Sequence, residues 1–210
     1  MDFSWTDAQR QLYNDVVTFA QNELHTDVVS RDKAGEFSRD DWQKCADFGI
    51  QGLLVPPEYG GRGYDLLTTM LAMEGLGYGC HDNGLTFALN AEMVSTQAAL
   101  LQAANEAQKQ KYLRGVTSGQ LIGAYAMTEP GSGSDAFSLT TSATAVDGGY
   151  LLNGRKHLIT FAPIADFAIV FATVYFYNSQ DFVVLLLAQP IARSTVIWGF
   201  YLGLCALLFF

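Results

Sequence analysis

The chain has 210 residues, half of them hydrophobic, and a formal net charge of −9. This composition supplies enough apolar side chains for a sizeable core and excludes global disorder, and the length fits one large domain or two small ones. Nucleic acids and anionic membranes attract clustered Lys and Arg, so the acidity argues against either as a partner.

The cysteines and the N-terminal residues bear on the cellular compartment. Cys45, Cys80 and Cys205 are widely spaced and form neither a CxxC motif nor a metal-binding pattern. The start MDFSW has the character of neither a signal peptide nor a transit peptide. Reduced thiols and a cytoplasmic protein are therefore expected.

Apolar residues at helical spacing dominate the first part of the chain. Thr6 or Ser4, Ser38 and Asn105 are suitable N-caps, and Gly49 is a suitable helix end. The segment 27–37 is polar and predicts no regular structure. We expect helices over residues 6–24, 38–49, 65–76, 85–103 and 106–114.

Glycines and prolines interrupt this helical region at two places. The run GLLVPPEYGGRG, residues 52–63, excludes a continuous helix or a central strand and is either a surface loop or a shaped loop near a ligand. The glycine-rich region 75–84 is expected to break the third helix. Core positions expected on the third and fourth helices include Leu66, Leu67, Met70, Leu71, Met73, Phe87, Met93, Val94, Ala98 and Leu101.

From Leu121 the pattern changes to that of strands, rich in Thr, Val, Phe and Tyr. The glycine pair after Asp147 predicts a hairpin turn. We expect strands over residues 139–146, 150–153, 157–160, 167–176 and 182–188. The predicted fold class is α+β, with a boundary near Gly119. An all-α helical domain (1–119) precedes a truncated, antiparallel, barrel-like middle β domain (120–188), and an apolar tail (189–210) follows.

The stretch YAMTEPGSGSD, residues 125–135, concentrates groups suited to a ligand between these two regions. Thr128 and the backbone N–H groups after it can supply hydrogen-bond donors, and Gly131 and Gly133 permit close approach of the backbone. Glu129 and Asp135 would repel a phosphate, so they are expected to hold N–H groups of the loop or a nearby Arg or Lys. An ordinary tight connection remains the alternative.

The segment Tyr125 to Ser138, YAMTEPGSGSDAFS, resembles the signature of the acyl-CoA dehydrogenase family. The resemblance continues in LNGRKHLIT (152–160) and ADFAIVFATV (165–174). The first helix, the GLLVPPEYGGRG loop and the fourth helix also occur in that family's order. The resemblance therefore spans roughly residues 1–174, and it implies FAD as the cofactor.

The resemblance also implies which residues form the site. Ser134 matches a position that contacts both the flavin and the pantetheine arm of the acyl-CoA substrate. Leu158 replaces an aromatic residue usual in the family, and Phe161 stands where the family often has Asn. The implied flavin-binding residues are Tyr125, Met127, Thr128, Gly133, Ser134, Leu158, Ile159 and Thr160.

The implied reaction is α,β-dehydrogenation of an acyl-CoA, with a carboxylate as base. In the family that base belongs to a C-terminal helical domain beyond residue 210, so no catalytic residue is assigned to this chain. Glu92 lies on an otherwise apolar helix, but a solvent-facing or capped acid is the favoured interpretation. The resemblance further implies fatty acid metabolism, an electron-transfer flavoprotein as electron acceptor, and homo-oligomers.

The uncharged run 194–210 leaves three interpretations open. It can be the product of a truncated or frame-shifted reading frame, a set of buried strands, or a membrane anchor, which is disfavoured because basic flanks are missing. Three functions correspond to these interpretations. They are an acyl-CoA dehydrogenase, a non-catalytic fragment that at most binds flavin or acyl-CoA, and a membrane-tethered relative.

Overall fold

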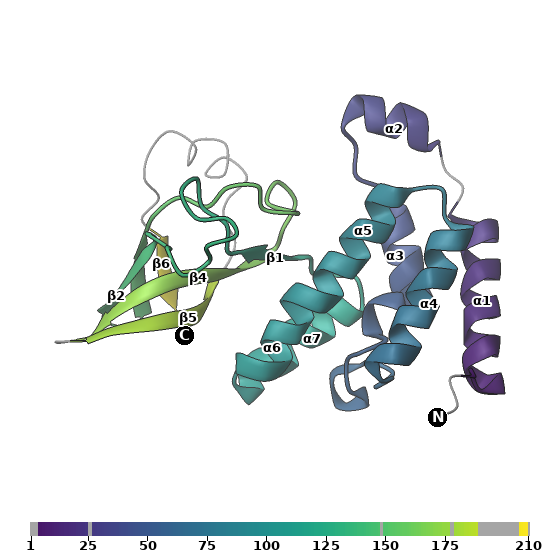
Figure 1. Cartoon of the computed structure of the whole chain (residues 1–210), viewed down its shortest axis with the longest axis horizontal. Helices are drawn as coiled ribbons and strands as arrows, with labels where there is room; N and C mark the ends of the chain where they lie inside the picture. Colours follow the sequence, from purple (N-terminus) through teal and green to yellow (C-terminus); the bar gives the residue numbers. More distant parts are fainter. Residues whose placement is uncertain (1–3, 25–26, 148, 177–178, 189–205, 210) are drawn as a thin grey trace. The chain divides into compact units, whose positions relative to one another are not determined.

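The structure, a computed structural model, describes residues 4–24, 27–147, 149–176, 179–188 and 206–209 (Figure 1). The chain divides into two compact units, one formed by residues 1–97 and 105–120 and the other by residues 98–104 and 121–210. A helical region is thus followed by a small sheet, which confirms the α+β class.

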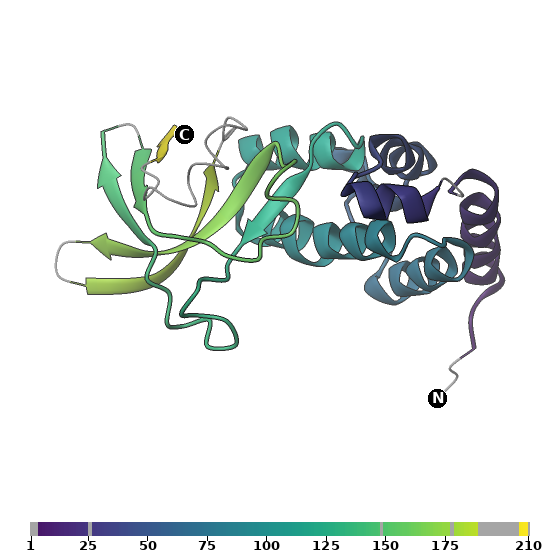
Figure 2. The ribbon, with the colours of Figure 1, turned by 90° about the horizontal axis from the view of Figure 1, so that it is seen from above.

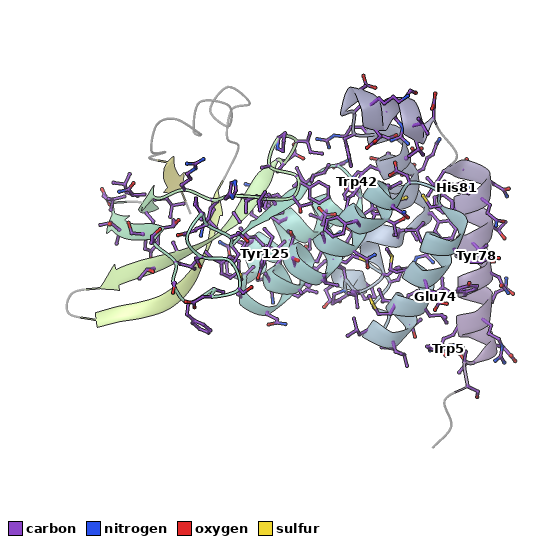
Figure 3. The ribbon with its side chains drawn as sticks, turned by 45° about the horizontal axis from the view of Figure 1, so that its top comes forward. Trp5, Trp42, Glu74, Tyr78, His81 and Tyr125 are labelled. Atoms are coloured by element: carbon purple, nitrogen blue, oxygen red, sulfur yellow. The ribbon has the colours of Figure 1, made fainter. Side chains whose placement is uncertain are left out.

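The first unit consists of helices joined by short turns. Thr6 caps α1 and Asn105 caps α7 through capping boxes, and Ser38 caps α3, as expected from the sequence. Trp42 on α3 is fully buried in this unit (Figure 3). The elements up to residue 120 are α1 (Asp7–Glu23), α2 (Val28–Ala34), α3 (Arg39–Phe48), η1 (Ile50–Gly52), η2 (Pro57–Tyr59), α4 (Leu66–Gly79), α5 (Asn83–Ala91), η3 (Glu92–Gln97), α6 (Ala98–Ala103) and α7 (Glu106–Thr117).

Helix α2 replaces the irregular segment expected over residues 27–37. The Asp27 side chain accepts a hydrogen bond from the N–H of Ser30, and Gly35 ends the helix in the left-handed conformation. No residue of this helix is buried. The prediction was wrong because it relied on an apolar stripe, whereas this helix depends on its two caps.

Helix α4 ends at Gly79, inside the glycine-rich region 75–84 that was expected to break it, but it continues past Gly75 and Gly77. Gly75 and Gly79 face α1, which lies beside α4 (Figure 1). A Cβ at Gly79 would lie 2.8 Å from the carbonyl oxygen of Val17 and 2.8 Å from the Cβ of Ala20. Gly75 and Gly79 therefore permit close packing between α1 and α4. At the other end of α4, Leu66 and Leu67 are exposed, contrary to the core positions expected for them.

The helix expected over residues 85–103 is divided by the π-helical segment η3 between α5 and α6. A π-helical turn shifts the side chains that follow to a different face of the helix. Val94, inside this segment, was expected in the core but is 51 % exposed, whereas Glu92 and Gln97 are buried. Phe87, also expected in the core, is 64 % exposed and lies on α5, before the π-helical segment. The Gln97 amide donates to the backbone oxygen of Gln51 at 2.7 Å. An amphipathic pattern with constant period could not predict this change of face.

The second unit is a mixed sheet with the long strand β4 (Phe167–Phe176) at its centre (Figure 2). Three pairs are antiparallel, as expected, but β1 and β2 both pair with β4 in parallel. The strand expected over 182–188 is present as β5. The remaining strands are β1 (Gly123–Ala126), β2 (Ser142–Val146), β3 (Gly149–Asn153), β5 (Ser179–Ala188) and β6 (Ala206–Phe209).

Small side chains form the core on one face of this sheet. Ala124 and Ala126 of β1 pack with Ala168, Val170 and Ala172 of β4, which alternate along the strand. The cluster is completed by Ala143 and Leu152, with Tyr150, Ile159 and Ala165 packed against it. Asp166 fixes the start of β1, since its carboxylate accepts from the N–H of Ile122 at 2.8 Å.

The apolar tail lies mostly outside the described residues. Of the run 194–210, only residues 206–209 are described, and they form β6, which pairs with β3. Among the described residues, no helix is both long enough and apolar enough to cross a membrane. Most of the run on which the membrane-anchor interpretation rests lies outside the described residues.

The glycines of α4 provide a matched pair for a stability test. Gly79→Ala should lower the free energy of unfolding by about 1–3 kcal/mol, because the new Cβ would overlap the backbone of α1. Gly77→Ala should raise it by about 0.5–1 kcal/mol, because its Cβ would meet only Thr86 Cγ2 at 3.9 Å and Gly disfavours helices. Denaturant unfolding measures both, and equal effects would contradict the close contact between α1 and α4.

Candidate functional site

The candidate site begins at the end of β1, in the middle of the stretch singled out from the sequence. Tyr125 lies on the face of the sheet opposite the alanine core, and its ring centroid is 4.7 Å from that of Phe171 on β4. The tyrosine ring is half-buried, and this burial raises the pKa of its hydroxyl. Tyr125 is labelled in Figure 3. The chain leaves the strand after Ala126 as a long loop that reaches β2 (Figure 2).

The tip of this loop is closed by its own backbone. The N–H of Glu129 donates to the oxygen of Ser132 at 2.9 Å, and the N–H of Ser132 donates back to the oxygen of Glu129 at 3.1 Å. The Ser132 hydroxyl donates to the backbone oxygen of Asp135 at 2.6 Å. The Asp135 carboxylate in turn accepts from the hydroxyl of Ser138. This hydrogen bonding gives the segment a defined shape, so it is not a flexible linker.

The carboxylate of Glu129 anchors the loop to the rest of the unit. Only 3 % of this residue is exposed, yet both of its oxygens are hydrogen-bonded. Oε2 accepts from the N–H of Thr140 at 2.7 Å and from its hydroxyl at 2.6 Å. Oε1 accepts from the N–H of Thr141 at 2.9 Å and from Lys156 Nζ at 2.8 Å. The expectation that this acid holds backbone N–H groups and a nearby cation is confirmed.

This environment keeps Glu129 ionised. Burial alone would raise the pKa of its carboxyl group, but the hydrogen bonds from Lys156, Thr140 and Thr141 outweigh burial and lower the pKa to about 2. Burial lowers the pKa of the Lys156 ammonium, and the adjacent carboxylate opposes that change. Because both ions are largely withdrawn from water, removal of either partner would leave an uncompensated buried charge.

The second predicted segment, Leu158 to Thr160, is connected to the first through the two residues before it. Lys156 Nζ donates to the backbone oxygen of Met127 at 2.9 Å. The N–H of His157 donates to the backbone oxygen of Thr128 at 2.9 Å. Two consecutive carbonyl groups of the loop are therefore held by two consecutive residues of the other segment. The structure thus brings the two predicted segments together.

The strand expected over residues 157–160 is absent, because the backbone here turns sharply. Leu158 and Phe161 adopt positive φ angles of 55° and 68°, which place both outside any strand. The N–H groups of Ile164 and Ala165 donate to the oxygen of Phe161 at 2.8 and 2.9 Å, which closes the turn. Asn tolerates this left-handed conformation better than Phe, which gives a backbone reason for the Asn often found here in the resembled family.

The predicted contact residues differ in their surroundings. Thr128 is half-buried, and neither its N–H nor its hydroxyl has a hydrogen-bond partner among the described residues. Gly133 and Ser134 are exposed at the loop tip, and a Cβ at Gly133 would meet no atom within 4 Å. Leu158 is 81 % exposed. Met127 and Ile159 are half-buried, and Thr160 is exposed. The roles of these residues remain predictions.

Two residues, Lys156 and Glu92, were missed or misjudged from the sequence. Lys156 was not singled out, although N–H groups of the loop or a nearby Arg or Lys were expected to hold Glu129. Glu92 is 1 % exposed, so the solvent-facing alternative for it was wrong. It lies on η3 of the first unit. No role at the candidate site is assigned to it.

The stability of the chain should depend on the ionisation of Glu129. Its folded pKa of about 2 lies below the ordinary value of 4.5, so its contribution is complete above about pH 5 and is lost as pH falls toward 2. Glu129→Gln should therefore lower the free energy of unfolding at pH 7 by about 3 kcal/mol, and the difference from wild type should shrink across that acid range. Denaturant unfolding from pH 2 to 7 measures this difference. Asp135→Asn, at an exposed acid of the same loop, is the control, and a difference that is constant with pH would contradict the assignment.

The left-handed backbone at Leu158 gives a second test. Leu158→Gly should raise the free energy of unfolding by about 1 kcal/mol, because glycine adopts this conformation without a Cβ clash and little apolar burial is lost. Leu158→Ala keeps the Cβ and should give no such gain. Thermal unfolding compares the stability of the two variants. An equal gain in stability in both would show that the Leu158 side chain, and not its left-handed backbone, causes the gain.

Comparisons with known proteins agree with this arrangement. Residues 6–120 match the model of the acyl-CoA dehydrogenase N-terminal domain, and residues 124–195 match that of the middle domain. The second match extends beyond residue 174, where the resemblance in the sequence was expected to end. One curated relative is an L-prolyl-[peptidyl-carrier protein] dehydrogenase from Serratia sp., 37 % identical over 82 % of this chain and 45 % of the relative.

Two further proteins extend the comparison. The mitochondrial isovaleryl-CoA dehydrogenase of Pongo abelii is 37 % identical over 80 % of this chain and 40 % of the relative. A solved structure described as the FAD complex of PigA superimposes with a TM-score of 0.84 and 35 % identity, over 90 % of this chain and 50 % of that one. The chain spans about half the length of these proteins. With both domain models matched, the chain belongs to the acyl-CoA dehydrogenase family.

Proposed function

We propose that this chain forms the FAD-binding part of an enzyme that oxidises an acyl thioester to its α,β-unsaturated product. The observation that carries the proposal is the free pair of donors on Thr128. Its N–H and hydroxyl have no partner among the described residues, while the carbonyl groups on either side of them are held by Lys156 and His157. A half-buried residue with two unused donors suits a ligand with acceptor atoms at its edge.

The residues around Thr128 fit a flavin in their chemistry. A flavin ring is flat, with hydrogen-bond acceptors along its pyrimidine edge and apolar faces. Thr128 and Thr160 supply donors, while Met127, Ile159 and Leu158 supply apolar surface. Gly133 leaves open space where a side chain would otherwise stand. The relative solved as an FAD complex and the family membership of the chain support the same cofactor.

Glu129, the buried acid of the loop, does not suit the role of proton acceptor. When bound, FAD supplies the acceptor for the hydride that leaves the β-carbon. The α-proton requires a base whose pKa lies near the working pH. Glu129 does not meet this requirement, because its pKa is about 2 and both of its oxygens are engaged. We therefore place the base outside the loop and assign no residue of this chain to it.

The acyl group and its carrier form the finer part of the proposal. One relative is named for a peptidyl-carrier protein and another for isovaleryl-CoA, so the proposed substrate is an acyl group on CoA or on a carrier protein. Ser134, exposed at the loop tip, is proposed to contact the pantetheine arm that such substrates share. An electron-transfer flavoprotein as acceptor, homo-oligomers and a cytoplasmic location remain part of the proposal.

FAD binding by the purified chain tests the proposal directly. The wild-type chain should bind FAD, as measured by flavin fluorescence, and Thr128→Val should raise the dissociation constant about tenfold through loss of one hydrogen bond. Thr144→Val, at an exposed threonine of β2, is the matched control and should bind like wild type. A wild-type chain without affinity for FAD would overturn the proposal. FAD binding without turnover of an acyl thioester would restrict the proposal to cofactor binding.

A further inference from the structure

We propose that Lys156 is a positioning residue that orients the N–H of Thr128 toward the flavin and strengthens it as a donor. The inference rests on the proposed function and concerns a residue that does not itself touch the cofactor. Its starting point is the hydrogen bond from Lys156 Nζ to the backbone oxygen of Met127, 2.9 Å long. The oxygen of Met127 and the N–H of Thr128 belong to the same peptide group.

A planar trans peptide links the directions of these two atoms. Because its C=O and N–H point in opposite directions, a carbonyl held toward Lys156 aims the N–H of Thr128 away from the lysine. The cis form is absent from the described part of the chain. The next peptide is fixed as well, since the oxygen of Thr128 accepts from His157 and the N–H of Glu129 donates to Ser132. The N–H of Thr128 is therefore held in place between two constrained peptide groups.

The charge of Lys156 adds an electronic effect to this orientation. A hydrogen bond from a cation to a peptide oxygen draws electron density toward that oxygen and makes the N–H of the same group a better donor. The effect is largest where water is excluded, and the Lys156 side chain is only 12 % exposed. Glu129 holds the ammonium in this position at 2.8 Å. The buried ion pair therefore sits behind the donor, on the side away from the ligand.

A strengthened donor should discriminate between the two redox forms of the flavin. Reduction increases the electron density of the pyrimidine edge, so the reduced form gains more from a strong donor than the oxidised form does. Lys156 should thus favour reduced flavin, and its removal should weaken binding of the reduced form most. This difference is measurable on the bound cofactor without turnover of a substrate.

The test compares three variants by FAD binding. Lys156→Met combined with Glu129→Gln removes the cation without leaving a buried carboxylate alone. Glu129→Gln retains Lys156 and is the reference for the double variant, and Arg155→Met removes an exposed positive charge from the neighbouring position. The dissociation constant of oxidised FAD should rise about tenfold in the double variant relative to Glu129→Gln, and that of reduced FAD should rise further. Arg155→Met should resemble wild type.

A second measurement needs no flavin and keeps the inference testable if binding is weak. In ¹⁵N-labelled chain without ligand, the Thr128 amide resonance should lie further upfield in the double variant than in Glu129→Gln, which retains Lys156. Circular dichroism establishes that each variant is folded. The role of Lys156 would be overturned if the double variant and Glu129→Gln had equal affinities for FAD and equal Thr128 amide shifts. The proposed function would stand in that case. A wild-type chain that binds no FAD would instead overturn the proposed function, while the amide shift still decides the orientation.

Discussion

The hydrogen-bonded ion pair between Glu129 and Lys156 is the constraint on which the candidate site depends. The carboxylate of Glu129 ties the first part of the loop after β1 to its last residues, Thr140 and Thr141, and the ion pair ties this loop to the segment before the turn at Leu158. Burial of two opposite charges is favourable only when both are fully hydrogen-bonded, and here four donors surround one carboxylate. The shape of the loop is thus set by electrostatics and not by apolar packing, because its tip is exposed.

The helices and the main strands could be predicted from the sequence, since both follow from caps and from regular spacing. Thr6, Ser38 and Asn105 mark three helix starts correctly, and the run from Phe167 to Phe176 forms one strand over its expected length. The failures have a common physical cause. α2, η3 and the turn at Leu158 depend on local hydrogen bonds or on a change of helical period, which hydrophobic periodicity does not represent.

The candidate site was predictable in its first segment and less so in its second. The hydroxyls and glycines after Tyr125 signal a ligand loop through their composition, and the need of Glu129 for a cation follows from elementary electrostatics. Which cation it would be could not be read from the sequence, because Lys156 lies far along the chain and contact depends on the pairing of β1 with β4. The loop sequence indicates that Glu129 requires a cation, and the arrangement of the sheet determines which distant residue supplies it.

The placement of β1 and β2 along the same edge of β4 has an evolutionary consequence. β1 ends opposite Val170 and β2 begins opposite Thr173, so the loop leaves and rejoins the sheet at anchors roughly 10 Å apart. Residues can be inserted or exchanged at its tip without a change in strand register, much as in an antibody hypervariable loop on a fixed framework. A substitution at the exposed tip can in this way change what the loop presents to solvent, while Thr128 and the buried ions at its base stay in place.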